Sequence, residues 1–447
     1  MLYLLFAFSI FLMLCTYLIC KRDILAPSVL AIIMYTISIG FALINIKSWG
    51  IVYSLKTFFV MVIGLTAFAL PCIFFNKNKK NRPIKSTPIR VDKKILLIFL
   101  FIDIIITFFY IKEVYAISLI GGNNLGLFGM AYYYRTYTAV NSDAESLSTL
   151  MNQLLKLGRA MGFCSIFILS YNLQFKNIDK KNNKYLAFIV FLTALQNLIG
   201  GGRGYILWMI GTSFSVIYFS DMKNNNWQKP ISFKYIKKGL LILCFSLTGF
   251  YFLKYLIRLG NSVNSIIDYI SYYIGGSIQN FNLYIQNPPV NTKMIIGQET
   301  FTGLYSTLQK FGIVDVSNVY LTNTNLEFRT SNGMTIGNVY GAIRRYYNDF
   351  GIIGVFLLQF ICSLFYNIFY SKLKKINNEK KFRWQMFFYS YLLYHIYEIA
   401  IDDCFFKNYI SFNMFTSFLV LYIVYWIMVH VHIEDYKIKI DRWVENK

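Results

Sequence analysis

Apolar runs of roughly 20 residues recur along this chain of 447 residues. A helix rises 1.5 Å per residue, so a run of about 20 residues can cross the ~30 Å hydrocarbon core of a bilayer. The composition agrees, because 56% of the residues are hydrophobic and only 15% are charged. We therefore predict an all-α polytopic integral membrane protein. The run at 2–20 lacks the basic segment and the cleavage site of a signal peptide, so we expect it to be retained.

The apolar runs predict about eleven transmembrane helices, which we place at 2–20, 24–46, 53–75, 95–111, 154–174, 185–201, 205–220, 239–257, 350–370, 385–402 and 408–430. Most of the 44 lysines and arginines fall in the loops and tail at 21–23, 76–94, 175–184, 221–238, 371–384 and 431–447. Basic loops mark the cytoplasmic side, so we expect the N-terminus outside and the C-terminus inside.

This topology divides the chain into three parts. Residues 1–257 hold helices one to eight, 258–349 form one large extracytoplasmic loop, and 350–447 hold the last three helices and a cytoplasmic tail. A smaller outside loop is expected at about 112–153. Helix-spaced apolar residues at 266–285 and 299–311 predict short helices in the large loop, at the outer membrane interface.

Several function classes are excluded by the same pattern. The net charge of +23 does not indicate nucleic acid binding, because the basic residues lie in short loops between apolar runs. The seven cysteines lie in or beside apolar runs without a CxxC pair, so we interpret them as small hydrophobes rather than metal ligands. The predicted cytoplasmic loops are too short for a nucleotide-binding domain. We expect neither a metal nor another cofactor.

Arginines gather near the outer ends of the predicted helices, at Arg159, Arg203, Arg258, Arg344 and Arg345. Each could reach the headgroups by snorkelling. Together, on the side that the orientation rule depletes of cations, they favour a shared anionic ligand. Arginine suits a diphosphate because its planar guanidinium makes bidentate contacts and stays charged.

Arg203 has the most unusual surroundings, in the run Gly200-Gly201-Gly202-Arg203-Gly204 between two closely spaced apolar runs. Glycines permit a broken helix and a close backbone approach to a ligand. Free N–H groups at the start of the next helix would then favour an anion.

Acidic residues inside the apolar runs are expensive and need partners. We expect Asp103 to pair with a buried cation. His395, Glu398 and Asp402 are spaced to share one helix face. They could line a cavity, relay protons or form a satisfied network between helices.

One stretch is similar to a known family. Gly337-Asn338-Val339-Tyr340-Gly341 leads into Ala342-Ile343-Arg344-Arg345-Tyr346-Tyr347-Asn348-Asp349-Phe350-Gly351-Ile352-Ile353-Gly354. With the Gly-Gly-Arg-Gly turn at 201–204 and a large outside loop, this stretch resembles the Wzy-type O-antigen and capsule polymerases. The number of helices agrees with their architecture, which is GT-C-like and shared with the O-antigen ligases.

The resemblance implies an enzyme of polysaccharide and lipopolysaccharide biosynthesis in the bacterial cytoplasmic (inner) membrane. Such glycosyltransferases move a growing glycan en bloc from undecaprenyl diphosphate to the non-reducing end of another lipid-linked repeat unit. A diphosphate is a good leaving group, so no metal is required. The implied partners are the two lipid-linked glycans and membrane lipids, with a chain-length regulator and a flippase of the same pathway as further possibilities.

The resemblance and the charge pattern together predict a site. We assign catalytic roles to Arg203, Arg344, Arg345 and Asp349. We assign substrate binding to Arg135, Arg159, Arg258, Asn338, Tyr340, Gly202 and Gly204. Asp349 and Glu327 are candidate bases, with Glu398 a weaker one. The alternative to a catalytic role is a structural one, in which Asp349 pairs with Arg345 one helical turn away and braces the ninth transmembrane helix.

Two other functions stay open at this point. A lipid-linked oligosaccharide flippase, or another transporter, would be expected to show internal repeats and matching broken helices. An O-antigen ligase shares the architecture, but enzymes similar to it rely on a histidine in the large outside loop. The three histidines here are His395, His430 and His432, and that loop contains none of them.

Overall fold

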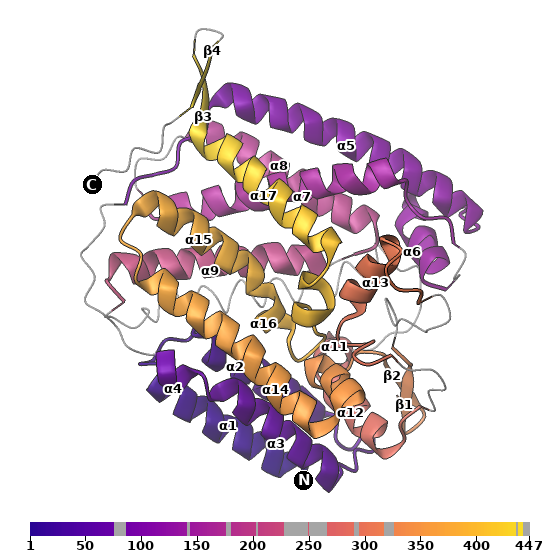
Figure 1. Ribbon diagram of the computed structural model, residues 1–447. Coiled ribbons are helices and arrows are strands. Elements are labelled where there is room, and N and C mark those ends of the chain that lie inside the picture. Colours follow the sequence, from indigo (N-terminus) through magenta and orange to yellow (C-terminus); the bar gives the residue numbers. More distant parts are fainter. Residues whose placement is uncertain are drawn as a thin grey trace. The chain divides into compact units, whose positions relative to one another are not determined.

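The computed structural model describes residues 1–75, 86–140, 144–175, 180–202, 204–227, 249, 266–289, 295–316, 326–434 and 437–440. Most of these residues are helical (Figure 1). Within this part of the chain, seven helices are long and apolar enough to cross a membrane: Leu2–Ile19, Pro27–Ile44, Leu55–Phe75, Lys93–Ile120, Thr149–Asn172, Gly341–Lys374 and Phe412–His430. The prediction of a mostly α-helical membrane protein is confirmed, and the full number of eleven transmembrane helices stays a prediction.

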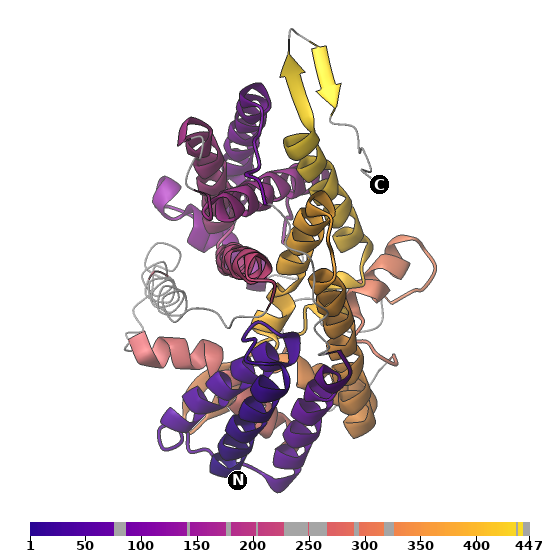
Figure 2. The same cartoon turned by 90° about the vertical axis from the view of Figure 1, so that its left-hand side faces the viewer.

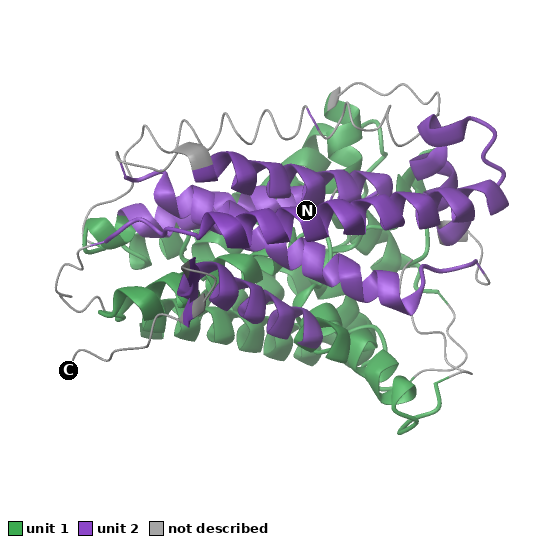
Figure 3. Ribbon diagram, turned by 90° about the horizontal axis from the view of Figure 1, so that it is seen from above, with its two compact units in different colours: residues 1–84, 222–233, 264–415 green, residues 85–221, 234–263, 416–447 purple. Residues whose placement is uncertain are grey.

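The chain forms two compact units, coloured in Figure 3, and neither unit is continuous in sequence. Unit 1 comprises Met1–Ile84, Met222–Phe233 and Asn264–Phe415. Unit 2 comprises Lys85–Asp221, Lys234–Val263 and Thr416–Lys447. The N-terminal end of the chain therefore belongs to unit 1 and the C-terminal end to unit 2.

Unit 1 contains the helices α1 (Leu2–Ile19), α2 (Pro27–Ile44), α3 (Leu55–Ala69), α4 (Cys72–Phe75), α14 (Gly341–Lys374), α15 (Glu379–Leu392), α16 (Tyr394–Glu398) and the π-helix Phe405–Tyr409. Helices α3 and α14 pack along each other. Gly64 of α3 makes this close approach possible, because an added Cβ would lie 2.8 Å from Ile343 Cδ1 and 3.0 Å from Val355 Cγ1. Helix α3 thus packs closely against the first part of α14.

The segment expected as the large outside loop also belongs to unit 1, as far as the structure describes it. It contains α11 (Ile266–Ile274), α12 (Gly276–Gln286) and α13 (Thr302–Lys310), which confirms the short helices predicted at 266–285 and 299–311. The hairpin of β1 (Arg329–Ser331) and β2 (Met334–Gly337) was not predicted. Asn332 and Gly333 both have positive φ, the conformation of a two-residue hairpin turn.

Unit 2 contains α5 (Lys93–Ile120), the 3₁₀ turn Gly126–Phe128, α6 (Met130–Val140), α7 (Thr149–Asn172), α8 (Lys180–Ile199), most of α9 (Gly204–Asn224) and most of α17 (Phe412–His430). A second hairpin, β3 (Val431–Glu434) with β4 (Lys437–Ile440), continues from the end of α17 (Figures 1 and 2). Helices α5, α7 and α8 contact one another, and Gly162 of α7 lies against Thr193 of α8.

Several boundaries differ from the sequence predictions. Helix α5 continues to Ile120, so 112–120 is helical rather than loop. The apolar run at 385–402 is broken, because α15 ends at Leu392 and α16 at Glu398. Helices α8 and α9 cover the runs at 185–201 and 205–220 but are not among the seven candidate spans. The run at 239–257 lies almost entirely outside the described residues.

The predicted cation partner of Asp103 is wrong for the described part of the chain. Asp103 is fully buried, and its Oδ1 accepts a hydrogen bond of 2.8 Å from the side-chain amide of Gln196. The same amide donates to Thr107 Oγ1 at 2.9 Å. Asp103 Oδ2 has no hydrogen-bond partner among the described residues. A neutral amide therefore takes the place that we expected a cation to fill.

Candidate functional site

The turn Gly337–Gly341 positions the polar residues at the start of α14. Gly337 and Gly341 have φ of 109° and 72°, a region that side chains rarely permit. Asn280 of α12 holds the turn from the inside, because its side-chain amide donates to the carbonyls of Gly337 and Val339 at 3.2 and 2.9 Å. Asn338 lies between these two anchored carbonyls. The glycines of the motif therefore form a turn that positions the polar residues at the start of α14.

The first N–H groups of α14 dock on the turn after α16. Gly341 N–H donates to the carbonyl of Ile401 at 2.9 Å, and Ala342 N–H donates to that of Ile399 at 3.0 Å. Helix starts leave such donors unpaired, so these contacts satisfy an obligatory need. A Cβ on Gly341 would lie 3.0 Å from the Ala400 carbonyl oxygen, so glycine is required here. This docking brings Asp402 beside α14.

Gly351 divides α14 into a polar and an apolar part. Its backbone, with φ 64° and ψ −154°, is not helical and produces a kink. Arg344, Arg345 and Asp349 precede the kink, and a long apolar segment follows it. The predicted start of the ninth transmembrane helix at residue 350 coincides with this break. The Phe350-Gly351 step of the motif is thus a helix interruption beside the charged residues.

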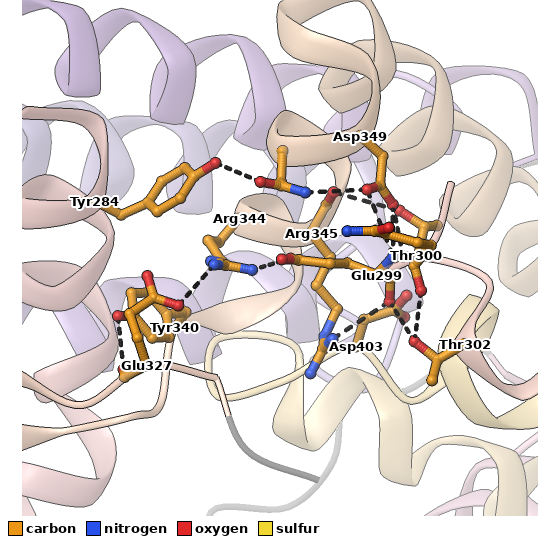
Figure 4. Close-up of polar contacts among 12 residues, drawn as sticks. Tyr284, Glu299, Thr300, Thr302, Glu327, Tyr340, Arg344, Arg345, Asp349 and Asp403 are labelled. Carbon is orange, nitrogen blue, oxygen red and sulfur yellow. Dashed lines mark hydrogen bonds and ion pairs between the residues drawn. The ribbon is translucent and has the colours of Figure 1, made fainter. Parts of the chain in front are cut away.

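Arg344 is buried between two tyrosine rings and two carboxylates (Figure 4). Its guanidinium carbon lies 4.5 Å from the ring centre of Tyr284 and 5.0 Å from that of Tyr340. One terminal nitrogen pairs with Glu299, and the other donates to Glu327 Oε2 at 2.9 Å. Its Nε is buried without a partner in the described structure. The rings and the two carboxylates together fix the plane of the guanidinium.

Glu327 joins Arg344 to a second arginine, Arg329 at the start of β1. Glu327 Oε1 lies 3.0 Å from Arg329 Nη2, and the Arg329 Nε donates to the Tyr340 hydroxyl at 3.2 Å. Burial lowers the pKa of Arg329, but the contacts with Tyr340 and Glu327 more than offset it, so the net pKa lies above its ordinary value. Burial and the charge of Glu327 raise the pKa of Tyr340, which stays a phenol and donates to the Glu327 carbonyl at 2.9 Å.

Arg345 faces a different carboxylate. Its Nε donates to Asp402 Oδ1 at 2.7 Å, and its Nη1 donates to the Glu299 carbonyl at 3.3 Å. Lys407 of the π-helix pairs with the other Asp402 oxygen at 2.6 Å. The Arg345 side chain is 3% exposed and that of Asp402 31% exposed. This arrangement matches the satisfied network that was one of the three possibilities for Asp402.

Asp349 does not pair with Arg345, so that prediction is wrong. Its carboxylate instead accepts the backbone N–H groups of Glu299 and Thr300 at 3.1 and 2.7 Å, as Figure 4 shows. The Asn348 amide donates to it at 3.1 Å. Asp349 therefore holds the segment that carries Glu299 against α14. Its role is structural, as the alternative to catalysis proposed, but it braces this segment instead of pairing with Arg345.

His395 and Glu398 have hydrogen-bond partners of their own. His395 is fully buried, and its Nδ1 accepts the Cys404 N–H at 3.2 Å, so its proton lies on Nε2, which is 3.3 Å from Cys362 Sγ. Glu398 accepts hydrogen bonds from the Tyr394 hydroxyl and the Cys404 thiol. Helix α16 ends at Glu398, and Asp402 follows in the next turn, where its N–H donates to the Glu398 carbonyl at 2.9 Å.

The remaining predicted site residues lie in unit 2 or outside the described part. Arg135 of α6 donates to the carbonyl of Gly201, whose φ is 69°. The guanidinium of Arg159 lies 4.3 Å from the ring centre of Tyr205. Helix α8 ends at Ile199 and α9 begins at Gly204, so Gly202 lies between the two helices, and the broken membrane helix stays a prediction. Arg203 and Arg258 lie outside the described residues.

Besides Lys407, which pairs with Asp402, the sequence analysis missed four site residues: Asn280, Tyr284, Glu299 and Arg329. Each is a polar or aromatic residue in the segment 258–349, where spacing alone does not distinguish it from its neighbours. Glu299 is the clearest omission, because it is 2% exposed and pairs with the buried Arg344. A rule that every buried arginine needs an acidic partner would have directed attention to the few carboxylates of this segment.

Comparisons of the chain with models of protein families, with curated proteins and with solved structures find no match. What the site can do chemically follows from the geometry of its own residues. Of its carboxylates, Glu327 and Asp402 are partly exposed, at 28% and 31%. Glu327 can accept a proton from a molecule that approaches from solvent, whereas Asp402 is held between Arg345 and Lys407. The guanidinium groups of Arg329 and Arg344 can bind an anion once Glu327 gives way.

Proposed function

We propose that the chain is a membrane glycosyltransferase that polymerises undecaprenyl-diphosphate-linked oligosaccharide repeat units of an O-antigen or a capsule. In this proposal it acts at the outer leaflet of the bacterial cytoplasmic membrane. It has about eleven transmembrane helices in a GT-C-like arrangement, with the N-terminus outside and the C-terminus in the cytoplasm. The reaction uses neither a metal nor a nucleotide.

One observation carries the proposal. The stretch 337–354, on which the resemblance to the Wzy-type polymerases rests, contains the two arginines that pair with Glu299, Glu327 and Asp402. It supplies Tyr340, Arg344, Arg345 and Asp349, and it precedes the apolar part of a candidate membrane helix. An arginine-rich site at the end of such a helix suits a substrate whose diphosphate lies at the membrane surface.

The proposed reaction joins two lipid-linked glycans. The non-reducing-end hydroxyl of the acceptor attacks the anomeric carbon of the donor glycan, and a glycosidic bond forms. The bond between that carbon and the diphosphate oxygen breaks, and undecaprenyl diphosphate leaves with the electron pair. Arg344 and the predicted catalytic Arg203 stabilise this charge, a kind of contact worth roughly 3 to 4 kcal/mol per key donor. Arg345 supports the site through Asp402.

The acceptor proton needs a base, and the geometry favours Glu327 among the three candidates. Glu327 is 28% exposed, whereas the Asp349 carboxylate already accepts two backbone N–H groups. Glu398 is occupied by Tyr394 and Cys404. In this proposal Asp349 keeps a positioning role, since it holds Glu299 against the arginines.

The test is to incubate the purified protein in detergent with the lipid-linked repeat unit alone and to resolve the products on a gel. A ladder of longer glycans supports the polymerase, whereas a flippase or a ligase without its acceptor gives none. Arg203→Ala and Arg345→Lys should each abolish most of the ladder without loss of folded protein. A full ladder from Arg203→Ala would remove that residue from diphosphate binding.

A further inference from the structure

Glu327 bridges two guanidinium groups in a way that an anionic ligand could copy. Its Oε1 contacts Arg329 Nη2 at 3.0 Å and its Oε2 contacts Arg344 Nη2 at 2.9 Å. Each carboxylate oxygen therefore serves one arginine. A phosphate group also offers several oxygens to separate guanidinium groups, so it can make the same pair of contacts.

The two arginines would keep their positions without Glu327. Arg344 is held by Glu299 on its other terminal nitrogen and by the rings of Tyr284 and Tyr340. Arg329 donates to the Asn287 carbonyl at 2.8 Å and to the Tyr340 hydroxyl at 3.2 Å. Glu327 can thus leave while both guanidinium groups stay fixed and pointed at the place that it occupied.

The exposure of the two acidic partners of Arg344 distinguishes their roles. The Glu299 side chain is 2% exposed and that of Glu327 28%. Glu299 is therefore the permanent partner and Glu327 the one at the surface. Arg344 itself is 1% exposed, and its buried Nε has no partner among the described residues, which leaves one donor for a ligand.

We propose that Arg329 and Arg344 form a binding site for a diphosphate group, which Glu327 occupies in the free protein and which the ligand enters by displacing the Glu327 carboxylate. This inference rests on the proposed function for the identity of the ligand, and it adds Arg329 as a binding residue. It also gives Glu327 a competitive role, because the carboxylate and the ligand cannot hold the same two donors at once.

The proposed site binds a diphosphate group, and two kinds of molecule carry that group. A lipid-linked diphosphate and free inorganic diphosphate carry the same anionic chemistry. We therefore use geranylgeranyl diphosphate as the lipid probe and inorganic diphosphate as the free one, with the full-length protein in detergent. Binding of each probe is measured by isothermal titration. If the ligand is a lipid carrier in the membrane, the lipid probe should bind more tightly than inorganic diphosphate. Equal affinity of the two probes would assign the site to free diphosphate.

The decisive variant is Glu327→Gln, which keeps the size of the side chain and removes its charge. Removal of an internal competitor that forms partly exposed ion pairs should tighten the binding of both probes about three- to tenfold. Arg329→Gln should weaken both at least about tenfold, as expected for the loss of a charged hydrogen bond. Glu327→Ala gives a second route to the same result if the glutamine variant folds poorly.

The matched control is Glu379→Gln, which also removes a carboxylate paired with an arginine in unit 1, Arg383 at 2.6 Å. It changes the net charge equally and should alter affinity less than about twofold. Unchanged or weaker binding in Glu327→Gln and Glu327→Ala would overturn the inference, as would binding that ignores Arg329→Gln. The glycan ladder tests the proposed function separately. A ladder without the expected binding changes would overturn only this inference, and the expected binding changes without a ladder would overturn only the proposed function.

Discussion

The triad of Arg345, Asp402 and Lys407 predicts an unequal response to the loss of each charge. Asp402→Asn leaves Arg345, which is 3% exposed, with the Glu299 carbonyl at 3.3 Å as the remaining acceptor for its side chain. A buried charge that loses its ionic partner costs about 3 to 5 kcal/mol of stability. The new amide still offers one oxygen, so we expect the lower end of that range, about 3 kcal/mol.

Arg345→Gln removes the same ion pair at a smaller cost. It leaves Asp402, which is 31% exposed, still paired with Lys407 at 2.6 Å. The expected loss is about 1 to 2 kcal/mol, close to that of one charged hydrogen bond. Lys407→Gln leaves the Arg345 contact intact and should cost less than about 1 kcal/mol.

The assay is unfolding in mixed micelles at increasing sodium dodecyl sulfate, followed by tryptophan fluorescence at one protein concentration. The predicted order of destabilisation is Asp402→Asn, then Arg345→Gln, then Lys407→Gln. The double variant Arg345→Gln with Asp402→Asn should be less destabilised than the sum of the two single changes, because no unpaired charge stays buried. An Arg345→Gln loss that equals or exceeds that of Asp402→Asn would refute this reasoning.

Three further predictions use the same unfolding assay. Gly162→Ala places a Cβ 2.6 Å from Thr193 Cβ and should cost about 1 to 3 kcal/mol, whereas Gly40→Ala meets Phe6 at 3.4 Å and should cost almost nothing; equal effects would contradict the close packing. Asp103→Asn should change stability by less than about 1 kcal/mol, since it removes a carboxylate without an ion pair in the described structure, and a large loss would indicate a cation there. Tyr340→Phe should cost about 1 to 2 kcal/mol through two lost hydrogen bonds, and a neutral result would remove the hydroxyl from the site.

The apolar periodicity predicted the helical class and the positions of the long helices well. Bilayer-length apolar runs have few alternative structures, so the helices at 2–20, 24–46 and 154–174 were found within a few residues. The break inside 385–402 was not found. Helix α16 ends at Glu398, and just beyond it the carbonyls of Ile399 and Ile401 accept the first N–H groups of α14, a contact that no local pattern encodes.

The candidate site could be predicted in part. The stretch 337–354 contains Tyr340, Arg344 and Arg345, and all three take part in the charged network of unit 1. Their partners could not be predicted, because Glu299 and Asp402 lie more than 40 residues away on either side and reach the arginines through tertiary packing. The expected pair of Arg345 with Asp349 failed because backbone N–H groups compete for that carboxylate.

The hairpin β1–β2 shows a signal that was present but unused. Asn332-Gly333 is a strong two-residue turn sequence, and it aligns Ser331 with Met334. Regular pairing from this turn places Arg329 opposite Ile336, next to the motif, and an irregularity between Arg329 and Thr330 moves it opposite Gly337. Helical spacing, the dominant pattern in this chain, gives no indication of so short a hairpin.

The most direct test of the central claim is the stoichiometry of the released carrier. Purified protein is incubated with a radiolabelled lipid-linked repeat unit in the presence of a chelator and without nucleotide. The number of undecaprenyl diphosphate molecules released is then compared with the number of new glycosidic bonds. Transfer from a lipid diphosphate predicts one carrier per bond and a ladder that survives the chelator. A folded protein that forms no bonds from this substrate, or forms them without release of the carrier, would contradict the account.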